Sequence, residues 1–332
     1  MCKRSTQYIG GLSFVYLIVA FFYPERKLMH IRGMIGGGNL KVRQLILTIG
    51  VIFSIYAIVL VFLLYLSGQV DMLYSLSLVF STVTGGGFVP TSATLDSQNT
   101  LGLITLMTGM IISALPFVFH YAVFSKEMHT TSVRPELFLY TIIIAICIIV
   151  FYFVLINTLE IQSQLMTSAF HIISAATNSG FQFINISQIS IEAKMILIIV
   201  MLIGGTAFST AGGIKVGRLL HIFQKITGKK FTTDYSGGSI SAVASPFNKK
   251  YVISESKPVK FKEERIFNET IYVIVLFIAV SFITGIIISY VDKVNFMDSL
   301  FDSVSALTTT GLSSGITSVN MDPISKIVLI II

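Results

Sequence analysis

The sequence predicts an all-α polytopic membrane protein, built from repeated units in which a short helix and a Thr/Gly-rich loop lie between two longer helices. Three observations predict this fold: a low charge content, long uncharged runs, and a loop motif that occurs three times. Only 12% of the 332 residues are charged and 54% are hydrophobic, whereas soluble chains carry roughly 25% charged residues. Too little polar surface remains to cover a particle folded in water, so a soluble enzyme, a secreted disulfide scaffold and a disordered chain are excluded.

Six uncharged runs each have at least 20 residues, enough for a helix to cross a hydrocarbon core of about 30 Å. They are 5–24, 44–66, 99–125, 137–159, 195–214 and 270–291. Lys and Arg gather in the loops 25–43, 126–136 and 215–265. Because cytoplasmic loops carry the excess of Lys and Arg, we expect a multi-pass protein of the plasma membrane with these loops inside. This topology explains the net charge of +7, so no nucleic-acid partner is expected.

Three apolar stretches are too short to cross a bilayer, 72–83, 163–176 and 297–307, and all lie in loops predicted outside. Each ends in the pattern Ser-x-x-Thr-x-x-Gly followed by Phe or Leu. Repetition at the same place in the topology implies one structural unit used several times. From the Thr to the Gly of the motif, the three loops read Thr84, Gly85, Gly86 and Gly87; Thr177, Asn178, Ser179 and Gly180; and Thr308, Thr309, Thr310 and Gly311.

Non-helical backbone at membrane depth is tolerated only where it is buried in protein or lines a watery cavity. A selectivity filter, in which backbone carbonyls replace the hydration shell of a cation, is the best-known case. Residues 72–95 and 161–191 contain no Asp, Glu, Lys or Arg, so a neutral oxygen cage for K⁺ or Na⁺ fits better than a site for a divalent cation or an anion. A simple turn between helices is the alternative for any one loop, but three loops in register favour a filter.

A glycine-rich stretch, 204–213, interrupts the helix that begins near Ile191. Each glycine costs about 1 kcal/mol in a helix interior, so we expect the helix to break there. Two interpretations are open: close helix packing on small residues, or a flexible intramembrane loop beneath the filter that obstructs the pore. The gate residues of the second interpretation are Gly204, Gly205, Ser209, Thr210, Gly212, Gly213 and Lys215.

The remaining polar residues predict structural roles. Asp71, Asp298 and Asp302 stand at or near the starts of short helices, where N-terminal capping and stabilisation of the helix dipole account for them better than attraction of cations. Lys194 is expected to reach the membrane interface, and His171 to pack within its helix. No catalytic triad, paired carboxylates or metal-ligand spacing occurs. An enzyme is not expected, nor is a covalently bound cofactor.

The stretch 204–218 (GGTAFSTAGGIKVGR) and residues 7–12 (QYIGGL) resemble the superfamily of K⁺ transporters that includes the bacterial and archaeal Trk and Ktr membrane subunits and the plant HKT proteins. The resemblance implies four repeats of an M1 helix, pore helix, filter loop and M2 helix around a pore of pseudo-fourfold symmetry. It also implies a homodimer with cytosolic nucleotide-binding regulatory subunits of the RCK type. Carried over, K⁺ would meet the backbone carbonyls of 84–87, 177–180 and 308–311, and 204–213 would be the gate.

By this resemblance the repeat arrangement is incomplete, because the first M1 and filter and most of the last helix have no counterpart. The expected organisation is 1–43, the outer helix of an incomplete first repeat with a cytoplasmic loop; 44–133, the second repeat; 134–225, the third repeat with a broken M2; 226–262, a cytoplasmic linker; and 263–332, the fourth repeat, truncated in M2. The expected function is transport of K⁺, with Na⁺ as the other ion. The alternative is a transport-inactive fragment or the assembly partner encoded by a split gene.

Overall fold

The structure, a computed structural model, describes residues 42–68, 71–89, 99–117, 119–120, 123, 134–156, 163–227, 259–318 and 321–332. Within those ranges every regular element is helical, so the predicted all-α fold is confirmed. The expected first outer helix and residues 7–12 lie outside the described residues, as does 228–258 of the expected linker.

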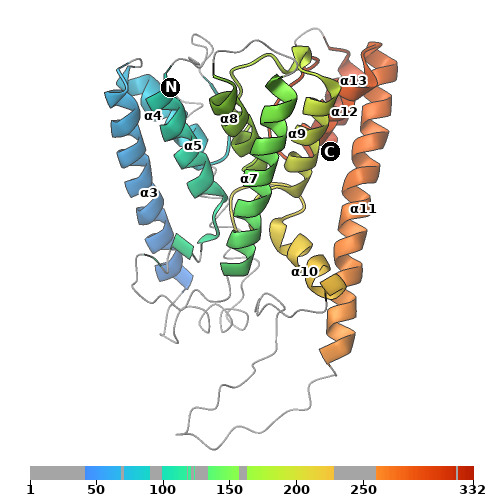
Figure 1. Ribbon diagram of the computed structural model, residues 1–332, viewed down its shortest axis with the longest axis horizontal. Helices are drawn as coiled ribbons and strands as arrows, with labels where there is room; N and C mark the ends of the chain where they lie inside the picture. The colour runs from blue at the N-terminus through green and yellow to red at the C-terminus, as the bar shows by residue number, and fades with distance from the viewer. Residues whose placement is uncertain are drawn as a thin grey trace, which may run out of the picture.

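Three long helices run in the same direction, from the lower to the upper edge of Figure 1. They are α3 (Val42–Leu66), α7 (Arg134–Ile156) and α11 (Val259–Asp292). A short helix follows each of them near the upper edge: α4 (Met72–Val83), α8 (Gln164–Ala176) and α12 (Phe296–Leu307). These bounds agree with the predicted short stretches to within one residue.

A further helix follows each short helix: α5 (Thr100–Ala114), α9 (Ile191–Ile203) and α13 (Pro323–Ile331). A short 3-10 turn, η2 (Ile186–Gln188), precedes α9, and α10 (Val216–Thr227) lies below it in Figure 1. The run 99–125 was expected to form one span, but its helix stops at Ala114. Leu115 is extended (φ −80°, ψ 151°) because Pro116 follows it.

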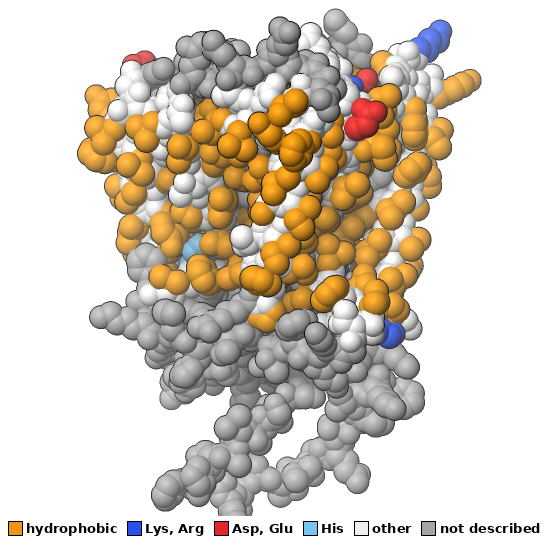
Figure 2. All heavy atoms as spheres, viewed as in Figure 1, with side chains coloured by type: hydrophobic (Ala, Val, Ile, Leu, Met, Phe, Trp, Pro, Cys, Tyr) orange, Lys and Arg blue, Asp and Glu red, His pale blue; other side chains and the backbone are white. Residues whose placement is uncertain are grey.

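Three helices of the described chain are long and apolar enough to cross a membrane, over 48–66, 135–156 and 267–292. Their outward side chains are apolar: Ile58 is 69% exposed and Phe138 is 70% exposed. Figure 2 shows hydrophobic side chains covering the middle of this face, with the charged ones near its upper and lower edges. Such a surface suits hydrocarbon rather than water.

Each long helix packs against the two helices that follow it, while α5 contacts α8 and α9 contacts α12. The hydrophobic core around α3, α4 and α5 includes Phe170 and Phe181 from the α8 segment. The core around α7, α8 and α9 includes Phe301 and Leu312 from the α12 segment. Each three-helix group is thus completed by residues of the next, which brings the loops after α4, α8 and α12 together.

Candidate ion filter and gate

The three filter loops, 84–87, 177–180 and 308–311, leave their helices through the same hydrogen bonds. The residue two positions after the Thr donates its backbone N–H to the carbonyl of the Ser that begins the motif. The bonds are Gly86 to Ser81 (2.7 Å), Ser179 to Ser174 (3.0 Å) and Thr310 to Ser305 (2.8 Å). A second bond, from the intervening residue to the carbonyl three residues earlier, completes a Schellman motif in each loop.

Two residues of each loop have left-handed backbone. The residue after the Thr is Gly85 (φ 69°), Asn178 (φ 51°) or Thr309 (φ 55°). The glycine that ends the motif is Gly87 (φ 62°), Gly180 (φ 74°) or Gly311 (φ 89°). Glycine adopts this conformation at no steric cost and asparagine tolerates it, but it strains a β-branched threonine. The repeated sequence motif is therefore a repeated backbone conformation.

The motif threonine secures each turn. Its hydroxyl donates to the carbonyl four residues earlier in its own helix, with oxygen–oxygen distances of 2.7 Å for Thr84, 2.8 Å for Thr177 and 2.7 Å for Thr308. The hydroxyl proton is consequently occupied within the protein. The backbone carbonyls of the loop and the lone pairs of the threonine hydroxyl oxygen remain for a cation.

The filter loops lie directly side by side. A Cβ atom added to Gly87 would overlap the carbonyl oxygen of Ser179, and one added to Gly180 would overlap the carbonyl oxygen of Thr310. In both cases the carbonyl that the added Cβ would overlap belongs to the residue directly before the motif glycine of the next loop along the chain. The relation between loops 84–87 and 177–180 is thus repeated between loops 177–180 and 308–311, so the loops follow one another by a common step.

His171 and Asp302 fasten the chain beyond two of these loops. Each precedes its motif serine by three residues, and each accepts the backbone N–H found three residues after the motif glycine. Phe183 donates to Nε2 of His171 (3.4 Å), and Ser314 donates to Oδ1 of Asp302 (2.7 Å). In the motif that begins at Ser81, Leu78 occupies the place of His171 and Asp302. The residue three positions after Gly87 is a proline, which has no N–H to donate.

Asp302 is 3% exposed and makes two further contacts: its Oδ2 accepts from the Ser313 hydroxyl (3.2 Å) and the Thr317 N–H (3.3 Å). The expected N-terminal capping role of Asp302 is therefore wrong. Asn295 caps α12 instead, through Met297. The side chain of Asp302, in the second turn of α12, faces the segment that follows the filter.

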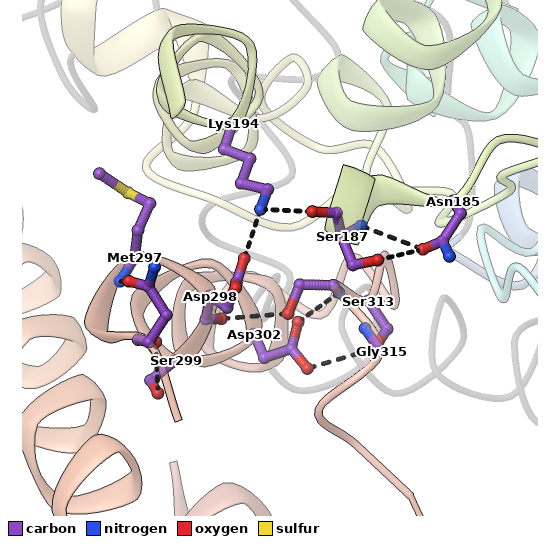
Figure 3. A network of polar contacts seen from close by, with 11 residues as sticks. Asn185, Ser187, Lys194, Met297, Asp298, Ser299, Asp302, Ser313 and Gly315 are labelled. Carbon is purple, nitrogen blue, oxygen red and sulfur yellow. Dashed lines mark hydrogen bonds and ion pairs between the residues drawn. The ribbon is translucent and has the colours of Figure 1, made fainter. Parts of the chain in front are cut away.

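Lys194 also differs from the prediction, since it is 5% exposed rather than at an interface. Its ammonium contacts the Asp298 carboxylate at 2.6 Å and donates to the Ser187 carbonyl (3.1 Å). Figure 3 shows this lysine of α9 reaching across to α12. Asp298 therefore has an ion-pair partner from another helix and does not serve as a cap, and Asp71 makes no side-chain capping bond either.

The glycine-rich stretch does interrupt its helix, as predicted. α9 ends at Ile203, and the next residue, Gly204, is left-handed (φ 68°); Gly213 (φ 76°) lies against Gly204 near the other end of the loop. Beyond the loop, Ile214 donates its N–H to the Leu202 carbonyl (2.8 Å) and Lys215 donates to Ile203 (2.9 Å). The loop is therefore closed at its base by bonds that satisfy the last carbonyls of α9.

The gate loop, 204–213, is anchored to the end of α5. Thr206 Oγ1 donates to the Ala114 carbonyl (2.6 Å), and Thr210 Oγ1 donates to the Ser113 carbonyl (2.8 Å). These carbonyls are available because α5 stops before Pro116. The proline that shortens α5 thus creates the attachment points for the gate loop.

The gate loop also touches the filter loops. A Cβ atom on Gly212 would overlap the Thr308 carbonyl oxygen, and one on Gly85 would lie 3.6 Å from Thr210 Oγ1. Asn178 donates its side-chain amide to the Met201 carbonyl (3.2 Å), just before the loop begins. The structure therefore brings the sequence-predicted filter and gate residues into one region of the fold.

Sequence reasoning missed Glu136, a fully buried carboxylate (0% exposed) whose Oε1 accepts the Ala207 N–H at 2.6 Å. It follows Pro135 at the start of α7, where an acid ordinarily marks a helix N-terminus. Its place beside a run of apolar residues was the available signal.

Comparisons with known proteins agree with this architecture. The sequence model of the TrkH family, described as "Cation transport protein", matches residues 3–332. An uncharacterized cation transporter of Methanocaldococcus jannaschii is 27% identical over 280 residues, which cover 84% of this chain and 54% of the relative. The Trk system potassium uptake protein TrkH of Halomonas elongata is 26% identical over 239 residues, covering 67% of this chain and 48% of the relative.

Among solved structures, the crystal structure of the potassium transporter TrkH from Vibrio parahaemolyticus has the same fold. It superposes with a TM-score of 0.73 at 18% identity, covering 98% of this chain and 67% of that chain. The chain spans about half the length of the curated relatives named above. Because the family's sequence model matches nearly the whole chain, the chain belongs to the TrkH family of cation transport proteins, a family of transporters and not of enzymes.

Proposed function

We propose that this chain conducts a monovalent cation, K⁺ with Na⁺ as the other candidate, across the plasma membrane between its three filter loops. The observation that carries the proposal is the repeated relation of Gly87 to Ser179 and of Gly180 to Thr310. A step that recurs between successive loops suits elements arranged around a common axis. Uncharged backbone oxygens on such an axis would replace the hydration shell of a monovalent cation.

The direction of the short helices supports a cation rather than an anion. α4, α8 and α12 each end at a filter loop, so the negative ends of their dipoles point toward it. The described filter residues carry no ionised side chain. The nearest buried carboxylate of α12, Asp302, is occupied by donors from 313–317.

We propose further that 204–213 is the gate. Its contacts with Gly85 and with the Thr308 carbonyl support a loop that stands across the path leaving the filter. The division into repeats at 44–133, 134–225 and 263–332, the cytoplasmic position of the Lys/Arg-rich loops, a homodimer and an RCK-type regulatory subunit belong to the same proposal. Two relatives, a Trk system and a Ktr system potassium uptake protein, support K⁺ as the ion.

Uptake of ⁸⁶Rb⁺ into K⁺-loaded liposomes containing the purified chain tests the proposal. We expect uptake above that of empty liposomes, inhibited by external K⁺ and unaffected by choline. Uptake that appears only after co-reconstitution with a second membrane subunit would favour the assembly-partner alternative. Absence of uptake under both conditions would contradict transport by this chain.

A further inference from the structure

Glu136 contacts both sides of the gate loop from a different helix. Its Oε1 accepts the Ala207 N–H at 2.6 Å, inside the loop. A Cβ atom on Gly217, in the first turn of α10, would lie 3.2 Å from the same oxygen. The absence of a side chain at Gly217 thus lets the carboxylate sit between the loop and the helix that follows it.

Lys215, just after the gate loop, also binds the loop. Its ammonium donates to the Ala211 carbonyl, and its backbone is left-handed (φ 81°). The acid therefore holds the loop through the N–H of Ala207, and the base holds it through the carbonyl of Ala211.

The second carboxylate oxygen, Oε2 of Glu136, is buried and has no hydrogen-bond partner among the described residues. A buried charge with an unsatisfied oxygen is costly for folding. An apolar residue at the start of α7 would avoid this cost but would leave the Ala207 N–H without its acceptor. What the carboxylate supplies here is therefore the attachment of the loop to α7. Ionisable residues within membrane proteins commonly mark functional positions.

We propose that Glu136 is a positioning residue that latches the gate loop against the filter. It does not contact the ion's path itself. It holds Ala207, which keeps Thr210 beside Gly85 and Gly212 beneath the Thr308 carbonyl. The inference rests on the proposed function only in treating this loop as a gate, since the attachment of the loop to α7 is a property of the fold.

Hydrogen–deuterium exchange of the chain in lipid nanodiscs tests the latch without requiring transport. In Glu136→Gln the amide oxygen can still accept the Ala207 N–H but carries no charge, so we expect the amides of 203–216 to exchange about fivefold faster, because a hydrogen bond to a charged group is the stronger by about 1 kcal/mol. Glu192→Gln is the matched control, because Glu192 also lies in the first turn of a helix but is exposed. Unchanged exchange of 203–216 in Glu136→Gln would overturn the proposal.

A conservative variant covers the case in which Glu136→Gln unfolds the protein and α8 and α12 also lose protection. Glu136→Asp keeps the charge and shortens the reach, so we expect faster exchange confined to 203–216, with a smaller factor. Equal protection in Glu136→Asp and the unaltered chain would also overturn the latch.

A flux measurement separates a latch from a merely structural contact. We expect Glu136→Gln to raise basal ⁸⁶Rb⁺ efflux from liposomes several-fold, whereas general structural damage would lower it. Lower efflux in a folded Glu136→Gln protein would count against the latch. If the unaltered chain carries no flux, the proposed function fails, and the exchange experiment still decides whether Glu136 holds the loop.

Discussion

Asn178 and Thr310 are separated by 132 residues, yet the Asn178 side-chain amide donates a 2.7 Å hydrogen bond to the Thr310 hydroxyl. The same amide donates to the Met201 carbonyl. One side chain therefore connects filter loop 177–180 with filter loop 308–311 and with the end of α9. Asn178 is 1% exposed, so these bonds form away from water, where losing a partner is most costly.

Replacing Asn178 with glycine isolates this bridge. Filter loop 84–87 already has glycine at the corresponding place, Gly85, with a similar φ. Asn178→Gly therefore removes the side chain without straining the backbone. We expect a loss of about 1 to 3 kcal/mol of stability, the net value of two hydrogen bonds. Thermal unfolding in detergent measures it, and an unchanged midpoint would show that the bridge carries no stability.

At the corresponding place in filter loop 308–311, Thr309, we expect substitution by glycine to increase stability instead. Thr309 is β-branched, exposed, and held at φ 55°, a conformation that costs of order 1–3 kcal/mol in strain. Thr309→Gly should relieve it and raise the unfolding midpoint relative to the unaltered chain. A lower midpoint would mean that contacts of the threonine side chain outweigh the strain.

Gly180 tests the close approach of the loops. Gly180→Ala adds a methyl group that overlaps the Thr310 carbonyl, in a left-handed backbone. We expect a loss of about 2 to 3 kcal/mol and of ⁸⁶Rb⁺ flux.

Two control variants separate the backbone strain of Gly180→Ala from its overlap with the neighbouring loop. Gly68→Ala has a similar φ of 76° with open space around it, so it carries the backbone strain alone; Gly50→Ala, within α3, has neither strain nor contact. Equal effects of Gly180→Ala and Gly68→Ala on unfolding and flux would argue against contact between the loops.

Asp302 should stabilise the segment that follows the fourth filter loop. Asp302→Asn keeps one acceptor oxygen but replaces the other with an NH₂ group, so the Thr317 N–H loses its acceptor and the Ser313 hydroxyl can only accept. We expect a loss of about 1.5 to 3 kcal/mol and faster amide exchange over 313–317. Exchange as slow as in the unaltered chain would indicate that backbone packing alone holds this segment.

The sequence predicts the short helices and the filter turns well because both are local. A Schellman turn needs only a few consecutive residues, and the motif places glycine or asparagine where left-handed backbone is required in two of the three loops. The break at Gly204 follows for the same reason.

The contacts that join the units could not be predicted in this way. Lys194 pairs with Asp298 over 104 residues, and Glu136 meets Ala207 over 71. Near the start of a helix an acid has the same sequence context whether it caps that helix or binds a distant backbone. Only the packing of α7 against the gate loop and of α9 against α12 distinguishes these roles.

Binding of a heavy alkali-like cation tests the central claim most directly. Crystals of the chain grown with Tl⁺ or Rb⁺ in place of K⁺ would reveal the ion by anomalous scattering. We predict a peak bordered by the backbone carbonyls of 84–87, 177–180 and 308–311, weakened by competing K⁺ and unaffected by choline. Ordered filter loops with no anomalous peak between them would contradict the account.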